Sequence, residues 1–328
     1  MADLSTKYMG LSLPTPLVLA SSALSNRVEN LKAAEANGAG AVVLRSLFEE
    51  QIEAADTALQ EELARVAGNN PEAASYFPSA RVGPTEYLKL IERAKGAVRI
   101  PVIASLNCAV PGSWADYARQ IEKAGADALE VNVYTVQADP QTAAEEIERR
   151  HLEIYQSVRK AVRIPVALKL SPFYTSVANV AARFDAAGVG ALVLFNRFLQ
   201  PDIDLDAVGL KSEMQYSSPA EMLLSLRWIA ILHGRLKADL AASTGVHDAA
   251  GVVKQLLAGA AVVQVASTLL QNGVAHLATL RDGLVEWMEK AGHEDLAGFR
   301  GSLSQKAVRE PGAFERAQYV HLILSQGA

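Results

Sequence analysis

The sequence contains one cysteine, Cys108, among its 328 residues. A single thiol cannot form an internal disulfide, a thiolate metal site or an iron–sulfur cluster, so we exclude these sites and expect a reducing, cytoplasmic location. The six histidines do not show the HxH or HExxH spacing of zinc enzymes, and we expect no metal.

Excess positive charge is also absent. The chain has 31 Lys and Arg against 36 Asp and Glu, a net charge of −5, which excludes the basic face that nucleic-acid binding requires. The N-terminus lacks a basic segment followed by an apolar stretch, so we expect no signal peptide. The uncharged stretch between Lys254 and Arg281 is interrupted by Gln264 and Asn272, so we expect no membrane span.

What is present is a large hydrophobic fraction, 50% of the residues, with 20% charged. Such a chain can bury a large core. Its length suits either one large α/β barrel with insertions or two ordinary domains. The repeats described next favour a single domain over residues 1–328.

Four segments share one pattern, in which a helical stretch ends, a glycine follows, and a short apolar run begins. The glycine suits a left-handed helix C-cap, and the run suits a strand buried on both faces. These segments are residues 37–45, 124–132, 187–195 and 258–266.

A second repeat, Val-Arg-Ile-Pro-Val, precedes apolar runs at 98–102 and 162–166. With two further strands at Leu17–Ala20 and Lys237–Ala241, the chain has eight. The alternation of strands and helices predicts a parallel (β/α)8 TIM barrel, whereas an open doubly wound sheet lacks support from a glycine-rich dinucleotide motif. The helical patterns are 27–37, 114–124, 140–161, 175–187, 219–236, 248–258 and 273–291.

Two connections are unusually long and leave the carboxyl ends of strands, the active face of a barrel. They are residues 46–97, with helical stretches near 49–66 and 85–96, and residues 197–218. We expect both to cover a site, and decorative insertion is the alternative.

Lys169 is the most informative strand-end residue, because it lies between two leucines of a strand that should be buried. A buried ammonium requires an anionic partner. It could pair with a carboxylate such as Glu130, form a Schiff base, or stabilise negative charge on a cofactor. Small residues around Ser243 and Ser267 suit the phosphate site of barrels, or simple helix N-caps.

Several of these segments resemble the dihydroorotate dehydrogenases, a family of FMN-dependent barrels. The resemblance is to the soluble class and covers nearly the whole chain. It implies an N-terminal hairpin and oxidation of dihydroorotate to orotate in pyrimidine biosynthesis. The matching residues are 11–22, Glu130-Val131-Asn132, Leu168-Lys169-Leu170, Asn196, 198–204, Thr244-Gly245 and Ala266-Ser267.

The resemblance also implies site residues. Those expected to bind FMN are Ala20, Ser21, Arg45, Ser46, Ser105, Asn132, Lys169, Thr244, Gly245, Ala266 and Ser267. Those expected to bind substrate are Arg45, Asn132, Gln137 and Asn196, and those expected to act in catalysis are Thr135 and Lys169.

The chain departs from the family pattern on the substrate side. Thr135 stands where the family has a cysteine or serine base, Gln137 replaces an asparagine, and Arg45 replaces a lysine. Thr244 replaces the first glycine of the phosphate loop, and the family's substrate loop is not recognisable in 67–84.

Three hypotheses follow. The first is an FMN-dependent dehydrogenase acting on dihydroorotate or a related small molecule. The second is a related flavoprotein with another substrate or redox partner, and the third is an aldolase-type lyase that uses Lys169 as a Schiff base. The resemblance allows a homodimer and a separate redox partner protein, which would have to carry any iron–sulfur relay.

Overall fold

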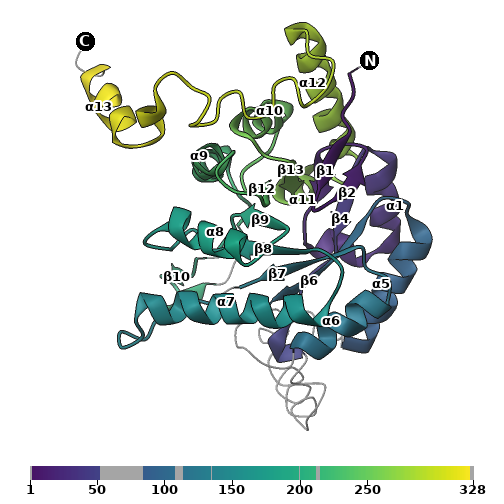
Figure 1. Cartoon of the computed structure of the whole chain (residues 1–328). Helices are drawn as coiled ribbons and strands as arrows, with labels where there is room; N and C mark the ends of the chain where they lie inside the picture. The colour runs from purple at the N-terminus through teal and green to yellow at the C-terminus, as the bar shows by residue number, and fades with distance from the viewer. Residues whose placement is uncertain are drawn as a thin grey trace.

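The computed structural model describes residues 2–51, 84–107, 114–133, 135–198, 200–211 and 215–325. Within them, parallel strands form a closed barrel surrounded by helices (Figure 1). The predicted TIM barrel is therefore confirmed. Its strands are β3 (Leu17–Leu19), β4 (Ala41–Val43), β6 (Val102–Asn107), β7 (Ala128–Asn132), β8 (Val166–Leu170), β9 (Ala191–Leu194), β12 (Asp239–Ser243) and β13 (Val262–Val265).

Closure of the barrel rests on three parallel pairings. Strand β3 lies between β13 and β4, and β4 pairs with β6 through Val42 opposite Val102. A two-residue strand, β5 (Leu47–Phe48), follows β4 and pairs in parallel with the carboxyl end of β6, with Leu47 opposite Leu106. All carboxyl ends therefore meet at one rim.

The larger helices alternate with these strands as predicted. In each of the four repeats the glycine after the helix has a positive φ, between 85° and 119°, which confirms the left-handed C-cap. The helices are α1 (Val28–Ala36), α5 (Pro84–Ala97), α6 (Trp114–Lys123), α7 (Ala144–Ala161), α8 (Val177–Ala186), α9 (Met222–Leu232), α10 (Ala249–Ala258) and α12 (His276–Ala291). Shorter or later elements are η1 (Ala23–Asn26), η2 (Pro219–Glu221), α11 (Ser267–Asn272), η3 (Pro311–Phe314) and α13 (Arg316–Ser325).

Several predicted boundaries were wrong. The seventh barrel strand starts at Asp239 rather than Lys237, because the Asp185 carboxylate accepts the N–H groups of Lys237 and Ala238 at 2.8 and 2.7 Å. The helix predicted over 219–236 is divided into η2 and α9 and ends at Leu232. The short helix α11 was not predicted.

The barrel interior is closed at its N-terminal end by a hairpin of β1 (Thr6–Tyr8) and β2 (Leu11–Leu13). Its turn has positive φ at Met9 and Gly10, the geometry of a two-residue hairpin turn. The fully buried Tyr8 packs with small interior side chains of the barrel strands. A second, larger core fills the space between strands and helices.

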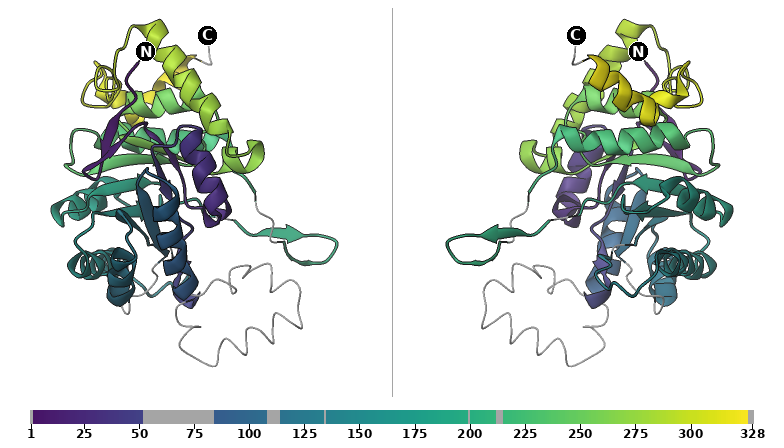
Figure 2. Two further views of the ribbon diagram at one scale, coloured as in Figure 1. Left: turned by 90° about the vertical axis from the view of Figure 1, so that its right-hand side faces the viewer. Right: turned by 90° about the vertical axis from the view of Figure 1, so that its left-hand side faces the viewer.

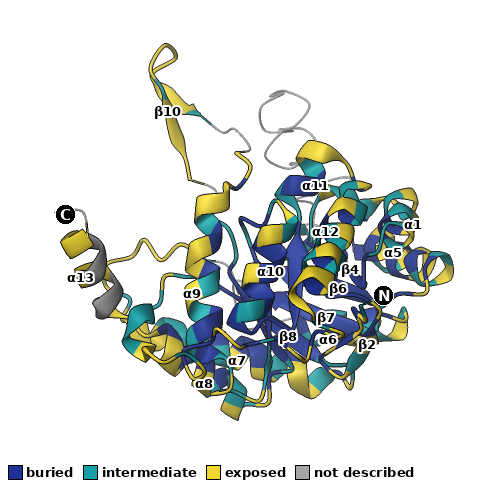
Figure 3. Cartoon of the chain, turned by 90° about the horizontal axis from the view of Figure 1, so that it is seen from above, coloured by how far each residue is buried: buried dark blue, intermediate teal, exposed yellow. Residues whose placement is uncertain are grey.

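The long connection after β9 contains a second hairpin, β10 (Asp202–Asp204) and β11 (Gly209–Lys211). It projects away from the barrel, and Ile203 and Leu210 on it are 64% and 76% exposed (Figures 2 and 3). The expectation that this connection covers a site is therefore wrong for the hairpin, although its return leg at 215–218 does reach the rim. Most of 49–66, nearly all of 67–84, and Cys108 lie outside the described residues. In the part of the chain that is described, no helix is both long and apolar enough to cross a membrane.

Candidate active site

The inward-facing side chains of β7 and β8 change from apolar to polar along each strand. Because side chains alternate along a strand, Ala128, Glu130 and Asn132 face the interior in that order. The apolar members lie near the hairpin, and the polar members lie toward the carboxyl rim. The same change occurs in β8 from Ala167 to Lys169.

Lys169 and Glu130 form the predicted ion pair inside the barrel. The Lys169 Nζ atom lies 3.6 Å from Glu130 Oε1, and the two residues are 8% and 1% exposed. The Gln264 Nε2 group donates a hydrogen bond to Glu130 Oε2 at 2.7 Å from the far side of the barrel. Below them, burial raises the pKa of Tyr8 well above its usual range, and Glu130 and Asp239 raise it further.

A cavity of about 200 Å³, here called the inner cavity, opens above this pair. It extends from the barrel interior to the loops after β12 and β13. Of the residues predicted from the sequence, it is lined by Ala20, Ser21, Lys169, Asn196, Thr244, Gly245, Ala266 and Ser267. Ser243 and Val265, from the segments interpreted as a phosphate site, and Arg197, next to Asn196, line it too, whereas the lining residues that the sequence interpretation missed are Ser217, Val246 and Gln264.

The rim end of the inner cavity has a strained backbone. Thr244 and Gly245 have φ values of 78° and 77°. A β-branched residue is rarely left-handed, and such strain marks functional sites. A Cβ atom on Gly245 would lie 2.3 Å from the Met222 backbone nitrogen, so glycine is required by close approach as well as by φ.

The alternative that this loop only supplies helix caps was wrong. Helix α10 is capped by Asp248, whose carboxylate accepts the Gly251 N–H at 2.7 Å. Ser243 lies inside β12, and Ser267 lies inside α11, whose N-cap is Ala266.

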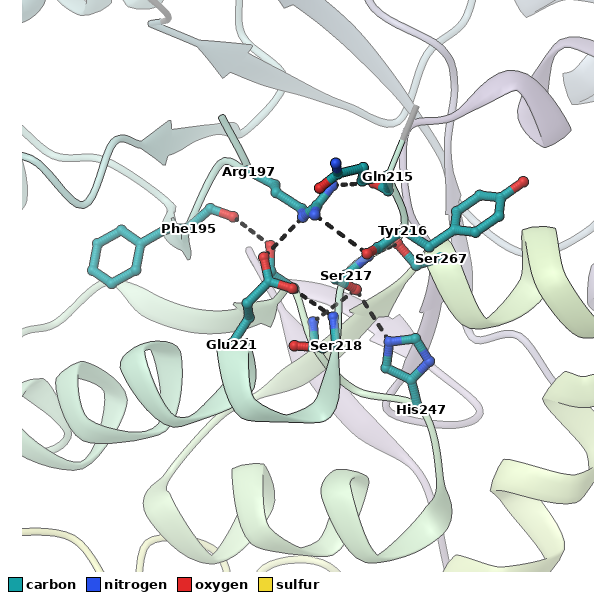
Figure 4. Close-up of polar contacts among 11 residues, drawn as sticks. Phe195, Arg197, Gln215, Tyr216, Ser217, Ser218, Glu221, His247 and Ser267 are labelled. Carbon is teal, nitrogen blue, oxygen red and sulfur yellow. Dashed lines mark hydrogen bonds and ion pairs between the residues drawn. The ribbon is translucent and has the colours of Figure 1, made fainter. Parts of the chain in front are cut away.

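Arg197 fixes the return leg of the β9 connection against this loop (Figure 4). Its Nε donates to Glu221 Oε1 at 2.9 Å, and its other nitrogens donate to the carbonyl oxygens of Gln215 and Tyr216. Burial opposes ionisation of Glu221, but hydrogen bonds from Ser218 and Arg197 outweigh it and hold the Glu221 pKa below its usual value.

The fixed segment places Ser217 at the rim of the inner cavity. Its N–H donates to Ser267 Oγ at 3.1 Å, and its Oγ accepts the Gly245 N–H at 3.3 Å. His247 Nε2 lies 3.1 Å from the same hydroxyl. Residues distant in sequence therefore form one polar wall.

A second, larger cavity of about 530 Å³ lies beside the inner one. Its wall includes the rings of Phe173 and Phe198, which pack edge to face with centroids 5.1 Å apart. Thr244 and Arg197 line both cavities and separate them.

Three predicted serines form a line of hydroxyl groups. Ser21 Oγ and Ser46 Oγ are 3.3 Å apart, and Ser46 Oγ and Ser105 Oγ are 2.8 Å apart. Ser21 lines the inner cavity, whereas Ser105 is fully buried, so Ser46 and Ser105 support Ser21 from behind. Nearby Arg45 is half-buried, which lowers its pKa, and no ion pair of Arg45 occurs among the described residues.

The side chains of the predicted substrate residues after β7 are held less firmly than those of the inner cavity. Asn132 is buried, but Thr135 is half-buried and Gln137 is exposed. The Gln137 side chain donates to Thr135 Oγ1 at 2.6 Å, and neither residue lines the two cavities. The structure therefore does not bring Thr135 and Gln137 to Lys169 as it does Asn196.

The inner cavity fits a polar planar ligand with a phosphate. Within the described residues, the buried acceptor atom Asn132 Oδ1, on the strand beside Lys169, has no hydrogen-bond partner. A heterocycle with N–H donors would satisfy acceptors of this kind, because unpaired buried polar atoms are costly. Lys169 supplies positive charge at the inner end, and Gly245 allows close backbone approach at the other.

Comparison with known proteins gives a consistent result. The dihydroorotate dehydrogenase family model matches residues 3–288. A dihydroorotate dehydrogenase B (NAD(+)) catalytic subunit of Methanosarcina acetivorans is 26% identical, covering 88% of this chain and 92% of the relative. The same subunit of Methanothermobacter thermautotrophicus is also 26% identical, covering 88% and 94%. The NAD-dependent dihydropyrimidine dehydrogenase subunit PreA of Escherichia coli is 26% identical, covering 93% and 78%.

Proposed function

The chain belongs to the dihydroorotate dehydrogenase family of CH–CH oxidoreductases, and from this premise we propose that it binds FMN and oxidises dihydroorotate or a closely related cyclic amide. The inner cavity carries the proposal. It combines a buried lysine, the Gln264 amide and a glycine-containing rim loop in one continuous space, and the unpaired amide oxygen of Asn132 lies on the strand beside Lys169.

The residues of the inner cavity divide into two groups. Lys169 and Gln264, with Asn132 beside them, would hold the ring, and Gly245 and Ser267 would hold the phosphate. Ala20 and Ser21 would lie along the ring, with Ser46 and Ser105 supporting Ser21. When bound, FMN accepts a hydride, and the protein supplies binding, orientation and charge. The Lys169 ammonium would stabilise negative charge that develops on the ring.

Substrate contacts would come from the neighbouring rim. Asn132 and Asn196 carry amides that can donate to and accept from a cyclic amide, and Arg45 can bind a carboxylate. Thr135 would occupy the position of the base. A threonine hydroxyl is a weak base, so its role would be to pass a proton to water rather than to hold it.

A second candidate substrate is a dihydropyrimidine without the carboxylate. One relative carries the name dihydropyrimidine dehydrogenase subunit, and Thr135, Gln137 and Arg45 all depart from the dihydroorotate dehydrogenase pattern. A flavoprotein that serves another redox protein is the further variant of this proposal. The relatives named as catalytic subunits support a separate redox partner.

The Schiff-base alternative is disfavoured by the contact between Lys169 and Glu130. The Lys169 Nζ atom lies 3.6 Å from the Glu130 carboxylate, so a lysine that attacked a carbonyl group would have to leave this ion pair. Family membership points the same way.

Anaerobic reduction of the bound flavin tests the proposal. The purified protein should be yellow, and dihydroorotate should bleach it in the absence of oxygen. Bleaching by dihydrouracil but not by dihydroorotate would select the second substrate. A protein that cannot be loaded with FMN would contradict the proposal itself, and borohydride trapping of a carbonyl compound on Lys169 would restore the lyase hypothesis.

A further inference from the structure

Glu130 is a buried charged residue to which the proposed chemistry assigns no role. It is 1% exposed and lies beneath the inner cavity without lining it. The two side chains that contact it, Lys169 and Gln264, both line the cavity. Glu130 would therefore act on a ligand through its charge and through these two side chains rather than by direct contact.

The contacts of Glu130 are unequal. Its Oε2 atom accepts a hydrogen bond from Gln264, whereas Oε1 has no hydrogen bond among the described residues and faces Lys169 Nζ at 3.6 Å. That separation allows strong Coulomb attraction in a buried site. The structure shows no hydrogen bond from Lys169 Nζ to a described residue, so its N–H groups remain available to a ligand in the cavity.

The barrel holds this arrangement in place. Glu130 lies in β7 and Lys169 in β8, two paired strands, and Gln264 reaches across the barrel from β13. The amide of Gln264 fixes the carboxylate on the side away from the lysine. The carboxylate is thus placed to offset part of the Lys169 charge while the N–H groups of Lys169 stay available to a ligand.

We propose that Glu130 is a positioning residue that sets how much positive charge Lys169 presents to a flavin bound in the inner cavity. This inference rests on the proposed function. Positive charge beside the flavin ring favours the reduced, negatively charged ring and raises the reduction potential. Glu130 therefore keeps the potential lower than Lys169 alone would set it.

The test is the two-electron midpoint potential of the FMN-loaded full chain, measured against a reference dye without oxygen. Glu130→Gln keeps the shape and the Gln264 contact but removes the charge. We expect it to increase the equilibrium ratio of reduced to oxidised flavin about tenfold, equivalent to ~30 mV for a two-electron couple. Lys169→Met should decrease the ratio.

The double variant decides whether Glu130 acts through Lys169. Without the lysine, a lone buried carboxylate is expected to take up a proton and become neutral. Glu130→Gln should then add nothing to Lys169→Met. Additive shifts, or an unchanged potential in Glu130→Gln, would overturn the inference.

Two further variants separate this role from folding. Asp239→Asn removes another partly buried carboxylate, at the hairpin end of the barrel, where it accepts the Met9 N–H at 2.7 Å, and the potential should not change. Glu130→Asp withdraws the carboxylate by one methylene and should shift the potential in the same direction as Glu130→Gln but less. Glu130→Asp replaces Glu130→Gln as the test variant if Glu130→Gln does not fold. An unchanged potential in Glu130→Asp would again overturn the inference. If the wild type binds no FMN, the proposed function fails instead.

Discussion

The inner cavity and the loop after β7 differ in how firmly the chain holds their side chains. In the inner cavity, Lys169 and Gln264 contact Glu130, and Ser217 joins Gly245 to Ser267. In the loop after β7, Thr135 is bonded to Gln137, an exposed neighbour two residues away.

This difference shows where the molecule is preorganised. A site built from strands and supporting contacts is positioned before a ligand arrives, whereas loops carry variation. Two of the departures from the family pattern, Thr135 and Gln137, lie in this loop, whereas a third, Thr244, lines the inner cavity. The inner cavity is thus the more firmly fixed of the two regions, and the loop after β7 is where we expect substrate specificity to change.

The largest effect is expected from Gly245→Ala. The new Cβ would overlap the Met222 backbone nitrogen, and the residue would be left-handed. We expect about 3 kcal/mol or more of destabilisation and the loss of FMN binding. Gly188→Ala is the matched control, because its φ is 85° but nothing lies within 4 Å of its Cβ, so about 1 kcal/mol should be lost. Equal losses by thermal unfolding would contradict the close approach at the rim.

Thr135→Cys tests the substrate side. If dihydroorotate is the substrate, a thiolate base should accelerate flavin reduction about a hundredfold at pH above about 8.5, with unchanged FMN affinity. Stopped-flow bleaching across pH measures this. No acceleration, with dihydroorotate bound normally, would place the base elsewhere, and Thr135→Val would control for packing.

Arg197→Ala should loosen the wall between the two cavities. It removes the Glu221 ion pair and the bonds to two carbonyl groups, so FMN affinity should fall about tenfold. Arg183→Ala is the control, because Arg183 forms a comparable ion pair with Glu148 at 2.6 Å away from the site. Titration of flavin fluorescence measures both, and a similar fall in both variants would contradict a local role.

Gln137→Ala should have the smallest effect. The side chain is exposed, and its bond to Thr135 is surface-exposed, so we expect less than about a twofold change in flavin reduction. A change above tenfold in the apparent dissociation constant of the substrate would show that this loop closes on the ligand.

Much of the fold could be predicted because each glycine-capped repeat places a helix end and a buried strand at fixed positions. The strand at Asp239 was predicted too early because a side chain from another helix, Asp185, binds the N–H groups of Lys237 and Ala238, which delays the strand after Gly234. Helix α11 was missed because six residues provide too little periodicity.

The site was predictable where a polar residue interrupts a buried strand. Lys169 was recognised by this signal, and Gln264 carries the same signal between Val263 and Val265 but was overlooked. Ser217 could not be found in this way, because its position depends on the return of a long connection to the rim.

The hairpin that closes the N-terminal end has a kinetic consequence. Thr6 donates to the carbonyl oxygen of Ala261, and the Asp3 N–H donates to the carbonyl oxygen of Glu294, so the hairpin segment bonds to residues more than 250 positions later in the chain. Contacts this distant in sequence form slowly, because the intervening loop must close first. During synthesis, the apolar face of the hairpin must wait for β12 and β13 before it can be buried. Until then the nascent barrel is open at its base, and this is the stage at which chaperone contact and aggregation would compete with folding.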